Sequence, residues 1–174
     1  MTHVAQEGNR REGDMTVAEI SQSVLDVESW FKKHAGDCLD HAQGASDGDL
    51  QSLEKAVDAS IPEELRSLMS IQNGHLWFSD KQALTCKAMV TEALEMEGRV
   101  PGWRPGLIPF AKDVDNTVLV ADAQARGCPV GEWDAEGEGT LVADTLSLFL
   151  ERFRNDLLSG RCEFVEGIGV VEKM

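Results

Sequence analysis

The sequence predicts an α+β fold, in which a central antiparallel sheet of about four to six strands packs against N-terminal helices and a C-terminal helix. Three observations carry this prediction. Apolar residues recur at helical spacing through the first half of the chain. Short β-rich runs joined by polar links follow between residues 107 and 143. A second stretch with helical spacing then begins near Asp144.

The N-terminal residues 1–14 are polar and contain glycine. We expect a flexible tail there, followed by a single domain over residues 15–174. The tail has no apolar core, so it is not expected to be a secretory signal. The first helix is predicted over about residues 16–34, where apolar side chains step by three and four positions. These side chains are Val17, Ile20, Val24, Val27 and Phe31.

Two further helices are expected next. The second helix begins near Ser46, a favoured N-cap residue followed by Asp47 and Asp49 in the first turn. The third begins with Pro62 at its first helical position, and the Asn73-Gly74 pair ends it.

A short strand and a fourth helix are predicted after this turn. The apolar run 75–78 is the candidate strand. Ser79-Asp-Lys-Gln82 matches a capping box, which predicts a helix from there to about Glu97. Its expected inward residues include Leu84, Ala88 and Leu94.

Four strands are predicted to form the sheet, over residues 107–111, 117–122, 128–134 and 139–143. Their short links favour an antiparallel meander. Pro109 and Pro129 lack a backbone donor, so each is expected at an edge or at the start of a strand.

The C-terminal part has the clearest helix, which Asp144 is expected to cap and Gly160 to close. Two short strands are predicted after it, over residues 162–165 and 168–171.

The charge of the chain limits its partners. It carries 31 acidic against 16 basic residues, a formal net charge of −15. Nucleic-acid binding depends on basic residues that neutralise phosphates, so we expect no nucleic-acid partner. No apolar run approaches the roughly 20 residues of a membrane span. We therefore expect a cytoplasmic, intracellular protein whose partner is a protein, with a basic one favoured by its charge. Plain solubility is the alternative explanation for the charge.

No motif predicts an enzyme, a cofactor or a metal site. The four cysteines and four histidines lack the close spacing of metal ligands or redox pairs. The segment Asp113-Val-Asp-Asn116 resembles the start of a calcium loop, but Val118 replaces the required glycine, so a hairpin turn is expected. An enzyme would need a pocket with perturbed titratable groups that the sequence does not indicate.

The candidate protein-binding residues are one tryptophan and four acids. Glu132, Asp134, Glu136 and Glu138 alternate, which predicts a common acidic face with Trp133 on the opposite side. A solvated hairpin edge that resists aggregation is the structural alternative. Trp103 lies in a loop rich in glycine and proline, where an aromatic side chain is a candidate binding residue rather than core.

Four groups of residues, in order, carry a resemblance to a known family. They are Val27-Glu-Ser-Trp-Phe-Lys-Lys-His-Ala35; then Gly44-Ala-Ser-Asp47, Ile61-Pro-Glu-Glu-Leu-Arg66 and Asn73-Gly74; then Trp103-Arg-Pro-Gly-Leu-Ile-Pro-Phe-Ala111 and Val130-Gly-Glu-Trp-Asp134; and Ser147-Leu-Phe-Leu-Glu-Arg-Phe153. In this order the chain resembles the SUKH superfamily and, within it, the Smi/Knr family of cell-wall assembly regulators. The chain differs from the family pattern at Asp113-Val-Asp-Asn116, where the family often has an Asp-Gly-Gly turn.

The resemblance implies an α+β fold and a protein-binding role without catalysis. It leaves two functions open. One is an adaptor or scaffold subunit of an intracellular complex, with cytoskeletal or cell-wall signalling complexes as examples. The other is an immunity protein that neutralises a basic, nuclease-like toxin. The net charge of −15 is suited to binding such a basic partner. The oligomeric state and the identity of the partner do not follow from the sequence.

Overall fold

The computed structural model describes residues 2–36 and 43–174, with side chains described from Val17 onward. The helices in these ranges are α1 (Thr2–His34), α2 (Asp47–Val57), α3 (Glu63–Ile71), α4 (Cys86–Arg99) and α5 (Leu146–Leu158). The strands are β1 (Trp77–Phe78), β2 (Lys81–Ala83), β3 (Leu107–Lys112), β4 (Val118–Asp122), β5 (Val130–Asp134), β6 (Gly137–Ala143), β7 (Cys162–Val165) and β8 (Gly169–Glu172). The predicted α+β class is confirmed.

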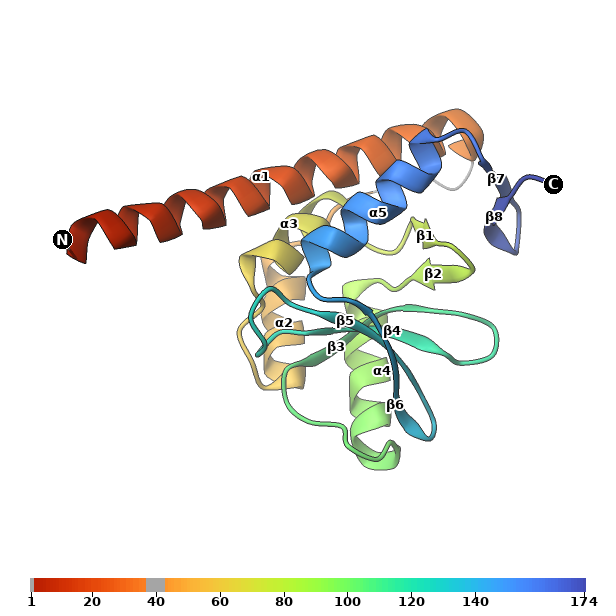
Figure 1. The fold of residues 1–174 in the computed structure, drawn as a ribbon. Coiled ribbons are helices and arrows are strands. Elements are labelled where there is room, and N and C mark those ends of the chain that lie inside the picture. The colour runs from red at the N-terminus through yellow and green to blue at the C-terminus, as the bar shows by residue number, and fades with distance from the viewer. Residues whose placement is uncertain (1, 37–42) are drawn as a thin grey trace.

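The sheet is an antiparallel meander, as predicted. Strands β1 to β6 pair in the order in which they occur in the chain, and β7 and β8 form a separate hairpin (Figure 1). Asp113 accepts hydrogen bonds from the backbone N–H groups of Asp115 and Thr117, both at 2.9 Å. The segment that resembled a calcium loop is therefore the turn of the β3–β4 hairpin.

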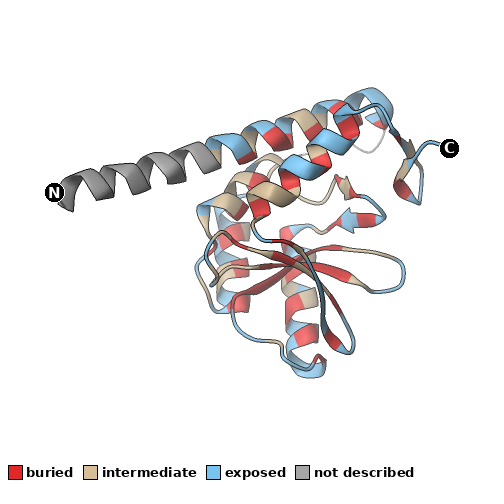
Figure 2. Cartoon of the chain, viewed as in Figure 1, coloured by how far each residue is buried: buried red, intermediate tan, exposed pale blue. Residues whose placement is uncertain are grey.

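Helices cover both faces of the sheet. Strand β4 shows how the sequence divides the two faces, because Val118 and Val120 belong to a small cluster with Met96 of α4. Leu119 and Ala121 point the other way, into the main core. That core also receives buried residues from α1, α2, α3 and α5, and from the N-terminal part of α4 through Cys86, Met89 and Ala93. Figure 2 shows the buried residues gathered between these helices and the sheet.

Helix α1 buries the predicted apolar face. Ile20, Val24, Val27 and Phe31 are all buried. The apolar periodicity predicted a start near residue 16, whereas the helical backbone extends back to Thr2. The expectation that residues 1–14 form a flexible tail stays a prediction. Among the described residues, no helix is both long enough and apolar enough to cross a membrane.

The predicted start of α2 is confirmed, and that of α3 moves by one residue. Ser46 caps α2 and accepts a hydrogen bond from the Asp49 N–H at 3.1 Å. Asp49 accepts one in return from the Ser46 N–H. Pro62 is the N-cap of α3 rather than its first helical residue.

The prediction of a helix from Ser79 is wrong. Ser79 has a φ of 57° and lies in the turn between β1 and β2. Gln82, the last residue of the expected capping box, pairs with Lys112 of β3. Helix α4 starts only at Cys86, after the N-cap Thr85. Of the expected inward residues, Leu94 is 53 % exposed, because the buried face carries Met89, Ala93 and Met96 instead.

The prediction of helix α5 is confirmed, but its N-cap is a different residue from the one expected. Thr145, not Asp144, accepts the hydrogen bond from the Leu148 N–H at 3.0 Å. Gly160 follows the helix with a φ of 81°, as expected for a glycine that ends a helix.

Both prolines lie at positions where the lack of a backbone N–H donor is tolerated. Pro129 directly precedes β5, as predicted. Pro109 lies within β3, beyond the last residue that pairs with the short β2, and the β3–β4 register shifts next to it.

Candidate protein-binding surface

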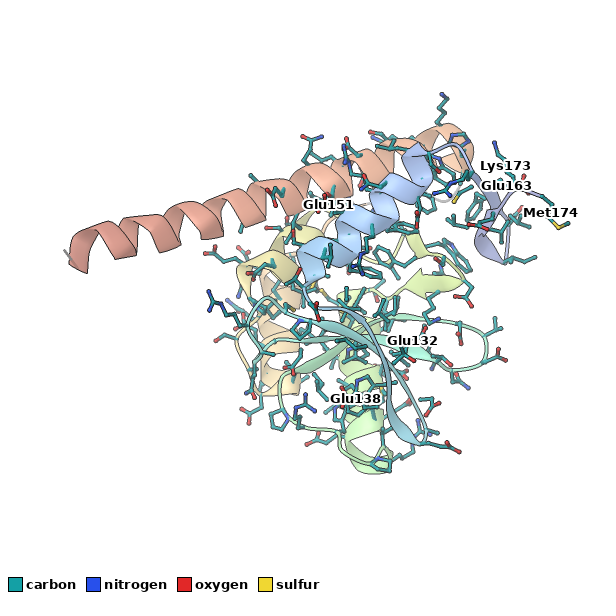
Figure 3. The ribbon with its side chains drawn as sticks, in the orientation of Figure 1. Glu132, Glu138, Glu151, Glu163, Lys173 and Met174 are labelled. Atoms are coloured by element: carbon teal, nitrogen blue, oxygen red, sulfur yellow. The ribbon has the colours of Figure 1, made fainter. Side chains whose placement is uncertain are left out.

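The β5–β6 hairpin carries the four predicted acids, and we call these residues the acidic hairpin: Glu132, Asp134, Glu136 and Glu138. Glu132 and Asp134 flank the buried Trp133 on β5, so they point to the face opposite to it. Glu136 lies in the turn, where its N–H donates to Asp134 at 2.8 Å. Figure 3 shows Glu132 and Glu138 on the sheet, away from the labelled acids Glu151 of α5 and Glu163 of β7.

The register corrects the prediction of one common face. Trp133 is the partner of Glu138 across the hairpin. Residues directly opposite each other in an antiparallel pair share a face. Glu138 therefore lies on the face of Trp133, and Glu132 and Asp134 lie on the other. Simple alternation fails here because the chain reverses at residues 135 and 136.

Lys81 neutralises part of the acidic hairpin. Its side chain is buried, and its ammonium nitrogen Nζ lies 3.3 Å from Asp80, 3.4 Å from Asp113 and 3.4 Å from Glu132. Burial alone would lower the pKa of Lys81. The hydrogen bond to Asp80 and the charges of the three carboxylates outweigh burial, so the pKa of Lys81 lies above its ordinary value. Glu132 is thus part of an internal ion-pair group.

The other three acids of the acidic hairpin are exposed and lie outside this ion-pair group. Within the described part of the chain, no ion pair involves Asp134, Glu136 or Glu138. A charge that has no internal partner keeps its full field at the surface, and this field speeds the approach of a basic protein.

A groove adjoins Asp134, and we call it the α4 groove. It has a volume of about 360 Å³ and lies between α4 and the β3–β4 and β5–β6 hairpins. Met96, Val100 and Val118 contribute apolar lining. At the rim, Lys112 donates to Glu92 at 3.0 Å. The groove is thus a recess directly beside the acidic hairpin, with buried apolar residues at its base and charged residues such as Glu92, Arg99 and Lys112 around them.

Trp103 has a structural contact. It is half-buried, and its ring lies edge-on to that of Trp133, with centroids 5.2 Å apart and an interplanar angle of 83°. The ring therefore covers the small core cluster from outside. That Trp103 also contacts a partner stays a prediction.

A second cavity, of about 570 Å³, lies between α1 and α5. Arg154 donates to Asp26 at 2.6 Å there and joins the two helices. This hydrogen bond is the main reason that the pKa of Asp26 lies below its ordinary value. None of the predicted binding residues lines this cavity.

The thiols and imidazoles form no reactive centre in the described residues. Cys86, Cys128 and Cys162 are buried and free, as expected for thiols that act as small apolar residues. His75 contacts Glu28 at 3.3 Å, and His34 stacks on Trp30. Cys38, His41 and the side chain of His3 lie outside the described residues. In residues 17–36 and 43–174, no cluster of three or more potential metal ligands occurs.

Two features of this surface escaped the sequence analysis. The buried position of Lys81 was missed because two of its three carboxylate partners, Asp113 and Glu132, come from a distant turn and a distant strand. The α4 groove was also missed, because the expected inward residues of the fourth helix included the exposed Leu94 and did not name Met96, which lines the groove.

The comparison with known families gives one result. A family model described as SMI1 / KNR4 family (SUKH-1) matches residues 44–152, which is more than half of the chain and includes the whole acidic hairpin. No curated protein matches the chain.

Proposed function

The chain belongs to the SMI1 / KNR4 family (SUKH-1), and on this basis we propose that it is a non-catalytic protein-interaction module. In this proposal it acts as an adaptor or scaffold subunit of an intracellular complex, with cytoskeletal and cell-wall signalling complexes as the first candidates. The observation that supports it is the set of exposed acids Asp134, Glu136 and Glu138, which have no ion-pair partner in the described part of the chain. The bound partner presents a basic surface to them.

The α4 groove gives this proposal a second contact. Charge alone raises the association rate and the selectivity of binding, whereas tight binding also requires apolar surface that becomes buried on binding. The groove beside Asp134 offers a recess of about 360 Å³ for a side chain of the partner, and this side chain would bring the apolar area, since Met96, Val100 and Val118 are already buried. Glu132 acts differently, because its bond to Lys81 holds the hairpin against the β1–β2 and β3–β4 turns.

A second function is supported by the same charge. An immunity protein must cover the basic active site of a nuclease, and exposed carboxylates replace the phosphates of its substrate there. The net charge of −15 and the three free acids fit this role. Adaptor and immunity protein differ in the partner rather than in the surface used.

Affinity purification of the tagged full chain from its own cells, with crosslinking and mass spectrometry, tests the proposal. We expect a stoichiometric partner whose crosslinks fall on β5, β6 and α4. Cytoskeletal or cell-wall signalling proteins support the adaptor role, and a single basic nuclease supports the immunity role. Recovery of no stoichiometric partner would count against both.

A matched pair of variants connects the partner to the acidic hairpin. The triple variant Asp134→Asn, Glu136→Gln, Glu138→Gln should slow association and flatten its salt dependence. The control triple Glu151→Gln, Glu163→Gln, Glu166→Gln removes the same charge from exposed acids of α5 and the β7–β8 hairpin. Equal effects of both triples would show that net charge, not this surface, governs binding.

A further inference from the structure

The two outer edges of the six-stranded sheet differ. Strand β1 ends the sheet on one side and β6 on the other. The β7–β8 hairpin covers the first edge, where the Val170 N–H donates to the Ser79 carbonyl at 2.9 Å. Gly169 lies so close to Ser79 and Trp77 that a side chain would not fit there. That edge is therefore closed by the protein's own C-terminal hairpin (Figure 1).

The edge formed by β6 is open. This strand has seven residues, and Glu138 to Leu141 are exposed one after another. A strand with one face on a core buries alternate residues, so four consecutive exposed residues mean that both faces of this stretch meet solvent. Leu141 is 59 % exposed. Among the described residues, no backbone hydrogen bond beyond the ladder with β5 involves residues 138–142.

An open strand edge presents unpaired N–H and C=O groups that can pair with another strand. Proteins often block such edges with lysine, proline or a β-bulge. Strand β6 contains neither lysine nor proline, and its ladder with β5 shifts register between Val130 and Gly131 and between Gly131 and Trp133. Its one charged residue is Glu138. A second copy of this chain would bring the same charge and a net charge of −15 to the contact, which disfavours pairing between two β6 edges.

We propose that β6 binds an extended, basic segment of a partner protein as an added β-strand. Glu138 and Leu141 are three positions apart, but the register shift between Gly131 and Trp133 pairs them with these two alternate residues of β5, so they share one face. A segment that places lysine or arginine beside Glu138 and an apolar residue beside Leu141 fits this face. Backbone hydrogen bonds supply affinity, and these two side chains supply selectivity. The inference rests on the proposed function and specifies how the basic partner is held.

A pair of synthetic peptides tests the proposal on the full chain. The first is a heptapeptide that carries lysine at positions 1 and 5 and valine at positions 3 and 7, so that both residue types share one face, with threonine at the positions between. The second has the same sequence with alternate backbone nitrogens methylated, which keeps every charge and removes the donors along one edge. We expect the first peptide to bind at least tenfold more tightly. It should also slow hydrogen exchange at amides within residues 138–142 and leave exchange in β1 unchanged.

Each other outcome has a definite meaning. Equal affinity for both peptides, lost in the triple variant of the acidic hairpin, would overturn strand addition and leave the proposed acidic docking surface intact. Binding of neither peptide would also overturn strand addition, while the partner capture described above would still decide the proposed function. Concentration-dependent protection of residues 138–142 without peptide would show that a second copy occupies the edge, and would overturn the assignment to a basic partner.

Discussion

The ammonium nitrogen of Lys81 lies 3.4 Å from a carboxylate oxygen of Glu132, although β3 and β4 separate their strands in the sheet. In a flat sheet, strands three positions apart would lie roughly 14 Å from each other. The curl of the sheet and the reach of two long side chains bring them together. This contact joins the β1–β2 turn to the hairpin that carries the acidic surface.

Replacement of Lys81 should weaken the fold. Lys81→Met leaves the carboxylates of Asp113 and Glu132 without their buried cation, so we expect a loss of about 1–3 kcal/mol in the free energy of unfolding. Urea denaturation followed by tryptophan fluorescence measures this loss. Lys87→Met, at an exposed position of α4, is the control and should change stability by less than about 0.5 kcal/mol. Equal effects of the two substitutions would contradict the role of Lys81.

Substitutions at two acids of the acidic hairpin should separate an effect on the stability of the fold from an effect on partner binding. Glu132→Gln removes a charge that Lys81 already neutralises, so it should lower stability more than Glu136→Gln and slow partner association less. Glu136→Gln should leave the unfolding midpoint unchanged and reduce the association rate. Stopped-flow association at two salt concentrations, together with urea denaturation, measures both quantities. The reverse ranking would show that Lys81 does not hold Glu132 in solution.

The tryptophan pair predicts a structural effect of Trp103. Trp103→Ala removes an edge-to-face contact with Trp133 and uncovers the small core cluster. We expect a loss of about 1–3 kcal/mol in the free energy of unfolding, and a smaller loss for Trp103→Phe because the phenyl ring keeps part of the contact. An unchanged unfolding midpoint for Trp103→Ala would mean that this side chain has no packing role and would leave binding as its function.

The loop before α2 should not accept a side chain at Gly44. A Cβ atom there would lie 1.8 Å from the carbonyl oxygen of Ser70, and backbone cannot move aside as a flexible side chain can. We expect Gly44→Ala to destabilise the fold by more than about 2 kcal/mol, measured by thermal and urea unfolding. Gly48→Ala is the matched control, because its Cβ would meet only Ser46 at 3.8 Å. This substitution in the first turn of α2 should stabilise by up to about 0.5 kcal/mol.

Buried thiols predict a loss of stability at alkaline pH. Burial, with smaller contributions from nearby carboxylates, raises the pKa of Cys86 and of Cys128 to about 12 from an ordinary value of 9.0. Above pH 9 the unfolded chain releases these protons while the folded chain keeps them, so the free energy of unfolding falls as the pH rises toward 12. Urea unfolding at several pH values between 7 and 11 measures the slope.

Removal of the thiols tests this cause. Cys86→Ala and Cys128→Ala should each lower stability at pH 7, because a buried side chain is shortened, and should each make the alkaline slope shallower. Slopes identical to that of the unchanged chain would assign the alkaline loss to other groups.

Local patterns in the sequence predicted those elements whose signals lie within a few residues. Ser46 and Asp49 cap α2 reciprocally, and this exchange needs only residues three positions apart. The strand predicted over residues 117–122 is β4, which the structure places over Val118–Asp122. The same kind of local pattern failed at Ser79, because a capping sequence is also compatible with a turn. There, pairing of Gln82 with Lys112 selected the strand.

The sequence by itself determined the α+β class, the order of strands β3 to β6 in the meander and the acidic character of the β5–β6 hairpin, because periodicity, turn residues and charge act locally. The tertiary structure decided which of those acids are free. Glu138 lies on the face of Trp133 because a hairpin turn reverses the chain. Glu132 is neutralised because the curl of the sheet brings Lys81 to it. The first relationship depends on the register of the hairpin and the second on the approach of strands distant in the chain, and alternation along a single strand encodes neither.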